Sequence, residues 1–83
     1  MIAGNFKSAL DRAFVDAQSR GHKFVDINSG NLHREVGGYP RASHRMPVCC
    51  DVMRATMKPG DRVLEEPPGG RGASLTIRYV LPR

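Results

Sequence analysis

The sequence predicts a small α+β domain that combines three helices with an antiparallel sheet of three strands. The N-terminal part carries a long apolar stripe at helical spacing, whereas apolar and polar residues alternate near the C-terminus, as in a strand with one covered face. Two shorter helical segments lie between them, separated by a Gly-Gly-Tyr-Pro bend. A chain of 83 residues allows one modest hydrophobic core, so residues 1–83 are expected to form one domain.

The first helix is expected over residues 4–20. Its apolar residues recur at the helical period, and the residues between them mix both charge signs, as on an ordinary solvated face. Gly21 is a natural left-handed terminator. The apolar stripe, which we assign to core packing, consists of Phe6, Ala9, Leu10, Ala13, Phe14 and Ala17.

A single short strand is expected over residues 23–27. Phe24, Val25 and Ile27 are β-prone, and the run is too short for a helix before Asn28 interrupts it. A lone strand cannot satisfy its own backbone groups. We therefore expect this strand to pair with the hairpin at the C-terminal end.

The second helix is expected over residues 29–36, with either Asn28 or Ser29 as its N-cap. Leu32 and Val36 form its buried pair, and two glycines end it. Helices of two turns depend on tertiary packing for their stability. This segment must therefore lie against the first helix or the sheet.

The third helix is expected over residues 43–58, capped by Ser43. Pro47 is tolerated because the backbone N–H groups of a first helical turn lack intrahelical partners. Cys50 is expected to be partly exposed, and both cysteines to be reduced thiols, since a bridge between adjacent helical residues would be strained. The side chains expected to face inward are Val48, Cys49, Val52, Met53 and Thr56.

Residues 61–82 are expected to form a β-hairpin with strands over residues 62–66 and 74–81. The second strand alternates clearly, with Leu75, Ile77, Tyr79 and Leu81 on one face. Its connection, residues 67–72, reads PPGGRG, and three glycines surround Arg71. These glycines predict a flexible tip that could follow a sugar–phosphate contour, with a stiffer approach set by the prolines.

The charge distribution favours a polyanionic partner. The chain has 13 Lys and Arg against 8 Asp and Glu, a net charge of +5. Most of the cations are arginines, whose planar guanidinium suits phosphates and guanine edges. Between Pro40 and Lys58, Asp51 is the one acid, and the cations there are Arg41, Arg45, Arg54 and Lys58. The excess positive charge is thus expected on and just before the third helix.

Several function classes are not expected. No stretch approaches the roughly 18 apolar residues of a membrane span, and the N-terminus lacks the apolar run of a secretory signal, so a cytoplasmic location is expected. Adjacent cysteines do not offer the spacing of a zinc site, so neither a metal nor a cofactor is expected. Glu65 and Glu66 point to opposite faces of a strand and cannot act as a carboxylate pair. We expect neither an enzyme nor a small-molecule substrate.

The order helix, strand, helix, helix, strand, loop, strand resembles a winged helix-turn-helix domain, and the resemblance is one of architecture. It implies that residues 43–58 are the recognition helix in the major groove of DNA. It also implies that residues 67–72 are the wing, placed on the adjacent backbone or minor groove. The link of residues 37–42 is longer and richer in glycine and proline than the usual turn of the family.

The candidate nucleic-acid-binding residues follow from this layout. An arginine in the first turn of a recognition helix can bond guanine through two hydrogen bonds, which suits Arg45; an ion pair with Asp51 or Glu35 is its alternative. Arg41 and His44 are expected to touch phosphate, and Arg54 to reach either a phosphate or a partner on the inner face of the helix. The wing-tip arginine is expected to have no local acid. The full set is Arg41, His44, Arg45, Arg54 and Arg71.

The leading functional hypothesis is a small protein that binds double-stranded DNA and acts by occupancy, as a repressor-type regulator or an accessory DNA-binding subunit. A tight regulator of this kind is expected to be a homodimer. Two alternatives stay open. One is a protein-interaction adaptor that docks on a larger complex such as a nuclease or a defence assembly, and the other is a structured-RNA-binding module.

Overall fold

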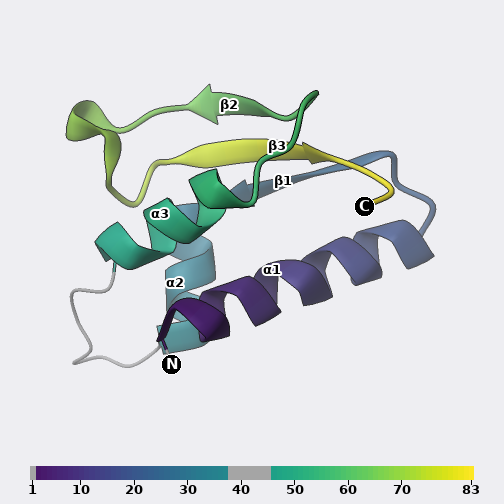
Figure 1. Cartoon of the computed structure of the whole chain (residues 1–83), viewed down its shortest axis with the longest axis horizontal. Helices are drawn as coiled ribbons and strands as arrows, with labels where there is room; N and C mark the ends of the chain where they lie inside the picture. The colour runs from purple at the N-terminus through teal and green to yellow at the C-terminus, as the bar shows by residue number, and fades with distance from the viewer. Residues whose placement is uncertain (1, 38–45) are drawn as a thin grey trace.

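Three helices cover one face of a three-stranded antiparallel sheet in the computed structural model, which describes residues 2–37 and 46–83 (Figure 1). The observed element order confirms the expected α+β class and the expected succession of helices and strands. In chain order the elements are α1 (Ile2–Ser19), β1 (Phe24–Asn28), α2 (Ser29–Gly37), α3 (Met46–Ala55), β2 (Arg62–Glu65), the short 3-10 helix η1 (Pro68–Gly70) and β3 (Thr76–Val80).

The long helix α1 has the position that its stripe predicts. Its bounds, Ile2–Ser19, differ by one or two residues from the expected range of 4–20. Gly21 follows with φ of +83°, the left-handed conformation expected for a terminator. The apolar stripe packs into the core, where Phe6, Leu10 and Phe14 are buried. In Figure 1 the helix runs along the lower side of the molecule, below α3 and the sheet.

The sheet joins the segment after α1 to the C-terminal part of the chain. Its strand order is β1-β3-β2, and β1 pairs antiparallel with β3, with Phe24 opposite Val80. The expected pairing of the first strand with the C-terminal hairpin is therefore confirmed. Ile77 and Tyr79 of β3 are buried against the helices, whereas Val80 is exposed on the other face. The alternation near the C-terminus thus correctly predicts a sheet with one covered face.

The second helix begins where the capping residues predict. The Oδ1 atom of Asn28 accepts a hydrogen bond from the backbone N–H of Asn31 at 3.0 Å, which identifies Asn28 rather than Ser29 as the N-cap. Leu32 is buried as expected. Ser29 is fully buried, and its hydroxyl points away from its own helix toward the β2–β3 loop.

The third helix ends earlier than expected. Its described part is Met46–Ala55, with Pro47 as the second residue, whereas the sequence predicts residues 43–58. The C-terminal difference arises because the backbone N–H of Lys58 donates to the carboxylate of Asp61 at 2.8 Å instead of continuing the helix. The expected first residues of the helix, 43–45, lie outside the described part of the chain.

The core contains both cysteines. Cys49 and Cys50 are free thiols and both are fully buried. The expectation of a partly exposed Cys50 is wrong, because the β2–β3 loop folds over it and brings the carbonyl of Gly72 to 3.4 Å from its Sγ. The residues buried with them include Phe6, Ala9, Leu10, Phe14, Ala17, Leu32, Met53, Leu75, Ile77, Tyr79 and Leu81.

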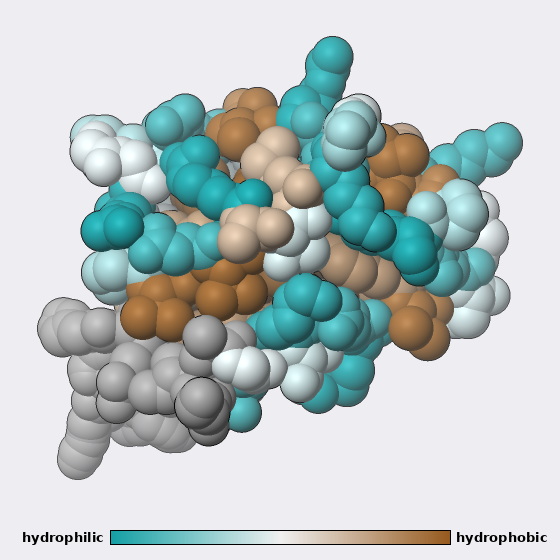
Figure 2. All heavy atoms as spheres, viewed as in Figure 1, coloured by the Kyte–Doolittle hydropathy of each residue, from teal (hydrophilic) through white to brown (hydrophobic). Residues whose placement is uncertain are grey.

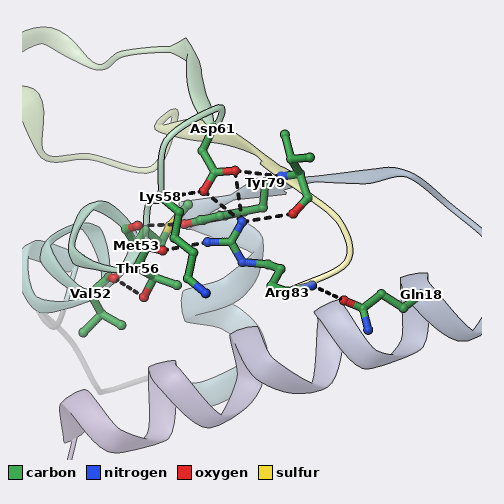
Figure 3. A network of polar contacts seen from close by, with 9 residues as sticks. Gln18, Val52, Met53, Thr56, Lys58, Asp61, Tyr79 and Arg83 are labelled. Carbon is green, nitrogen blue, oxygen red and sulfur yellow. Dashed lines mark hydrogen bonds and ion pairs between the residues drawn. The ribbon is translucent and has the colours of Figure 1, made fainter.

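A polar network around Arg83 fastens the C-terminal residues to the helices (Figure 3). The Arg83 guanidinium lies 2.9 Å from the carboxylate of Asp61 and donates to the carbonyl of Thr56 at 2.7 Å. Its central carbon also lies 4.9 Å from the centre of the Phe14 ring. The backbone N–H of Arg83 donates to Oε1 of Gln18 at 2.7 Å. This network joins α1, the turn after α3 and the end of β3.

Candidate nucleic-acid interface

The outward side of α3 and the β2–β3 loop of residues 66–75 form one surface, called here the α3–loop surface. Cys49, Cys50 and Met53 face the core, so the opposite side of α3 is left to solvent. Pro47, Asp51 and Ala55 are exposed and follow one another at intervals of four residues. Since residues four apart lie on one side of a helix, they form a single outward line along α3.

The loop is attached to two helices. The carbonyl of Gly72 accepts hydrogen bonds from the hydroxyl of Ser29 at 2.5 Å and from the thiol of Cys50 at 3.4 Å. The backbone N–H of Gly30 donates to the carbonyl of Ala73 at 3.1 Å. The sequence predicts a flexible tip. The structure instead shows a loop that is anchored to α2 and α3.

Two arginines link α3 and the loop in opposite directions. Arg54 of α3 donates to the carbonyl of Gly70 at 2.9 Å and lies 3.3 Å from the carboxylate of Glu66. Arg71 of the loop donates through Nε and Nη2 to the two carboxylate oxygens of Asp51 on α3, at 3.1 and 3.0 Å. The expectation that Arg71 has no local acid is therefore wrong.

The structure brings together two of the five candidate residues, Arg54 and Arg71, on the α3–loop surface. The other three, Arg41, His44 and Arg45, lie outside the described residues. The alternative partner considered for Arg45, Asp51, is already held by the guanidinium of Arg71.

The formal charges of residues 46–72 balance. This segment holds four cations and four acids, because the acids after α3 offset the cations of α3 and the loop. Most of the excess positive charge expected between Pro40 and Lys58 is carried by Arg41 and Arg45. Glu65 at the end of β2 and Glu66 in the loop are both exposed, and Glu66 is paired with Arg54. The cations in this segment are Arg54, Lys58, Arg62 and Arg71, and the acids are Asp51, Asp61, Glu65 and Glu66.

Sequence reasoning missed the contribution of Asp51 and Ser29. The sequence marks Asp51 only as the lone acid of a basic segment, although its place on the outward side of the expected helix is a signal that it meets a cation. Ser29 is a candidate helix cap by sequence, and its contact with Gly72 joins residues 43 positions apart. No local pattern predicts a contact over that distance.

Both thiols are part of the hydrophobic core. Burial, followed by the neighbouring Cys50, raises the pKa of Cys49 from 9.0 to about 12. Its Sγ lies 3.6 Å from the carbonyl of Ser29. A thiol in this environment stays protonated at neutral pH and is therefore a poor nucleophile and metal ligand.

The exposed residues of the α3–loop surface are polar or lack a large hydrophobic side chain. Figure 2 shows hydrophobic areas on its view of the molecule that are separated by hydrophilic ones. Over residues 2–37 and 46–83, no helix combines the length and the apolar character that crossing a bilayer requires.

Comparison of the chain with protein-family models, with curated proteins and with solved structures gives no match.

Proposed function

We propose that this chain is a winged-helix domain that binds double-stranded DNA, with α3 as the recognition helix and the β2–β3 loop as the wing. The observation that carries the proposal is the exchange of arginine contacts between α3 and the loop. These contacts hold a helix and a hairpin loop as one surface. A surface of this kind can meet a groove and the neighbouring backbone together.

The topology supports the same proposal. The β2–β3 hairpin and β1 form one sheet, and α3 precedes the hairpin directly. The described outward line of α3 carries Pro47, Asp51 and Ala55, none of which is bulky. An α-helix about 10–12 Å across matches a major groove about 12 Å wide, and small outward side chains allow a close approach.

The arginines supply the contacts to the DNA backbone in this proposal. Arg71 keeps its two hydrogen bonds to Asp51 and contacts a phosphate through its remaining N–H groups, and Arg54 holds the loop in place beside it. Arg41 and His44 are proposed as further phosphate contacts, and Arg45 as a contact to a guanine edge. The domain then acts by occupancy, as a repressor-type regulator or an accessory DNA-binding subunit.

Salt titration of binding to a labelled DNA duplex tests the proposal. Contact with about four phosphates predicts that log K falls with log salt concentration with a slope near −3.6. Arg71→Ala should reduce the magnitude of that slope by about 1. Arg20→Ala is the matched control, because Arg20 is also an exposed arginine paired with an aspartate, Asp16, but lies at the end of α1. Absence of duplex retention at moderate salt would contradict the proposal.

The balanced charge of residues 46–72 favours the adaptor as the second candidate. A protein that docks on a larger protein complex does not need a net positive binding surface. The adaptor predicts no salt-dependent retention of either DNA or RNA. A structured-RNA-binding module would instead retain duplex RNA in competition with duplex DNA, so the same titration with both polymers separates the three functions.

A further inference from the structure

One hydrogen-bonding side chain lies on the described outward line of α3. Pro47 and Ala55 offer no side-chain donor or acceptor, whereas Asp51 between them offers two carboxylate oxygens. A helix that enters a groove reads base edges through the side chains on its outward line. Over residues 46–55, that reading depends on Asp51.

Asp51 is held in one orientation by the loop. Arg71 donates one hydrogen bond to each carboxylate oxygen, at 3.1 and 3.0 Å, so the two groups meet in a bidentate arrangement. Each oxygen can accept a further hydrogen bond, since a carboxylate has about four acceptor positions. Asp51 is 53% exposed, which leaves these positions accessible.

Arg71 also removes the electrostatic objection to an acid in a DNA groove. An unpaired carboxylate would be repelled by the phosphates. The Arg71–Asp51 pair has no net charge, and the Asp51 carboxylate in it can still accept hydrogen bonds. The loop arginine therefore makes an acidic side chain compatible with a polyanionic partner.

The chemistry of an acceptor-only group selects among bases. In the major groove, cytosine presents the N4 amino group as a donor, and adenine presents the N6 amino group beside the N7 acceptor. A carboxylate can accept a hydrogen bond from the N4 amino group of cytosine, and cytosine has no acceptor of its own beside that group. At adenine, the N7 acceptor lies beside the N6 amino group and repels the carboxylate. Guanine and thymine present acceptors at the corresponding positions, so they are disfavoured.

We propose that Asp51, positioned by Arg71, is a specificity-determining residue that selects cytosine at one position of a DNA site by accepting a hydrogen bond from its N4 amino group. The proposal rests on the proposed function, because it requires α3 to enter the major groove. It assigns to Asp51 a role distinct from the phosphate contacts of the arginines.

Selection of binding sequences from a randomised DNA duplex pool tests this role and identifies the bound site in the same experiment. The unmodified chain should enrich cytosine at one position, and replacing that base should weaken binding about tenfold or more. Asp51→Ala should lose the preference there and retain duplex binding. Asp51→Asn should shift the preference to adenine, because an asparagine amide pairs with both N6 and N7.

The matched control is Asp16→Asn, which alters an exposed aspartate of α1 that pairs with Arg20. It should leave the selected sequence unchanged. If the Asp51 variants select the same bases as the unmodified chain, the assignment of Asp51 is overturned while DNA binding stands. If the unmodified chain does not retain duplexes at all, the proposed function fails together with it.

Discussion

Two Arg–Asp pairs in this molecule have nearly the same length and opposite surroundings. The closest N–O distance is 2.9 Å between Arg83 and Asp61 and 3.0 Å between Arg71 and Asp51. The exposed side-chain fractions are 6% and 1% in the first pair and 57% and 53% in the second. The comparison teaches that solvent access, rather than contact distance, determines whether an ion pair supports the fold or remains available to a partner.

The buried pair is part of a fully bonded network. Besides Arg83, Asp61 accepts hydrogen bonds from the backbone N–H groups of Val80 and Lys58, at 2.7 and 2.8 Å. Burial raises the pKa of Asp61, but these N–H groups and the Arg83 guanidinium outweigh it and lower the pKa below 3.8. The carboxylate is therefore charged in the folded state at neutral pH, and Figure 3 shows its partners converging on it.

Removal of Asp61 should have the largest effect on stability. Asp61→Ala leaves the Arg83 guanidinium buried without its counter-ion, which should lower the free energy of unfolding by about 3–5 kcal/mol. Urea unfolding followed by circular dichroism measures the change. Asp51→Ala is the matched control in the exposed pair, and it should cost at most about 1 kcal/mol. Equal losses in the two variants would contradict the comparison.

The pH dependence of the free energy of unfolding should show the contribution of the buried Arg83–Asp61 pair. The pKa of Asp61 is lower in the folded chain than its ordinary value of 3.8, so its contribution is present above about pH 4. That contribution should disappear as the pH falls through the lowered pKa, because the unfolded chain then binds the proton more readily. Urea unfolding of the parent chain and of Asp61→Ala between about pH 6 and pH 2 measures it.

The difference in unfolding free energy between these two chains should shrink toward the acid end. A difference that stays constant over that range would mean that the Asp61 charge does not contribute to folding.

Ser29→Ala should have an intermediate effect on stability, because it removes one of the contacts that attach the β2–β3 loop to α2. The variant leaves the carbonyl of Gly72 without the hydroxyl donor of Ser29, although the thiol of Cys50 remains. Loss of a buried hydrogen bond of this kind should cost about 1–2 kcal/mol. Thermal unfolding measures the loss. Ser19→Ala, an exposed serine that bonds only within α1, is the control and should change little.

The smallest expected effect is the coupling within the exposed pair. A double-mutant cycle of Arg71→Ala and Asp51→Ala should give a coupling energy below about 1 kcal/mol for folding. The same cycle on Arg83 and Asp61 should give a clearly larger value. A strong coupling between Arg71 and Asp51 would mean that this exposed pair is a structural support like the buried one.

Local patterns in the sequence are sufficient for most of the fold. The stripe of α1, the alternation of β3 and the cap at Asn28 each depend on residues within a few positions of one another, and each is found in the structure. The need of a lone strand for a partner also predicts the pairing of β1 with the hairpin correctly.

The candidate site is less predictable, because its contacts join distant parts of the chain. The Arg71–Asp51 and Ser29–Gly72 contacts span 20 and 43 positions, and they fasten a loop whose composition suggests freedom. The burial of Cys50 follows from the same loop. A helical wheel assigns the sides of α3 but does not indicate that the hairpin folds back over one of them.

The carbonyl of Gly72 accepts two hydrogen bonds, and this affects how binding of a partner to the loop can be detected. One carbonyl receives donors from the start of α2 and from the middle of α3, both of which line the hydrophobic interior. Displacing the loop therefore means uncovering Cys50 and Ser29 to water. The backbone N–H of Gly30 donates to the carbonyl of Ala73 in the same loop. A ligand that binds the hairpin tip and holds the loop in place should therefore slow hydrogen exchange of the Gly30 amide, which is far from the tip in sequence.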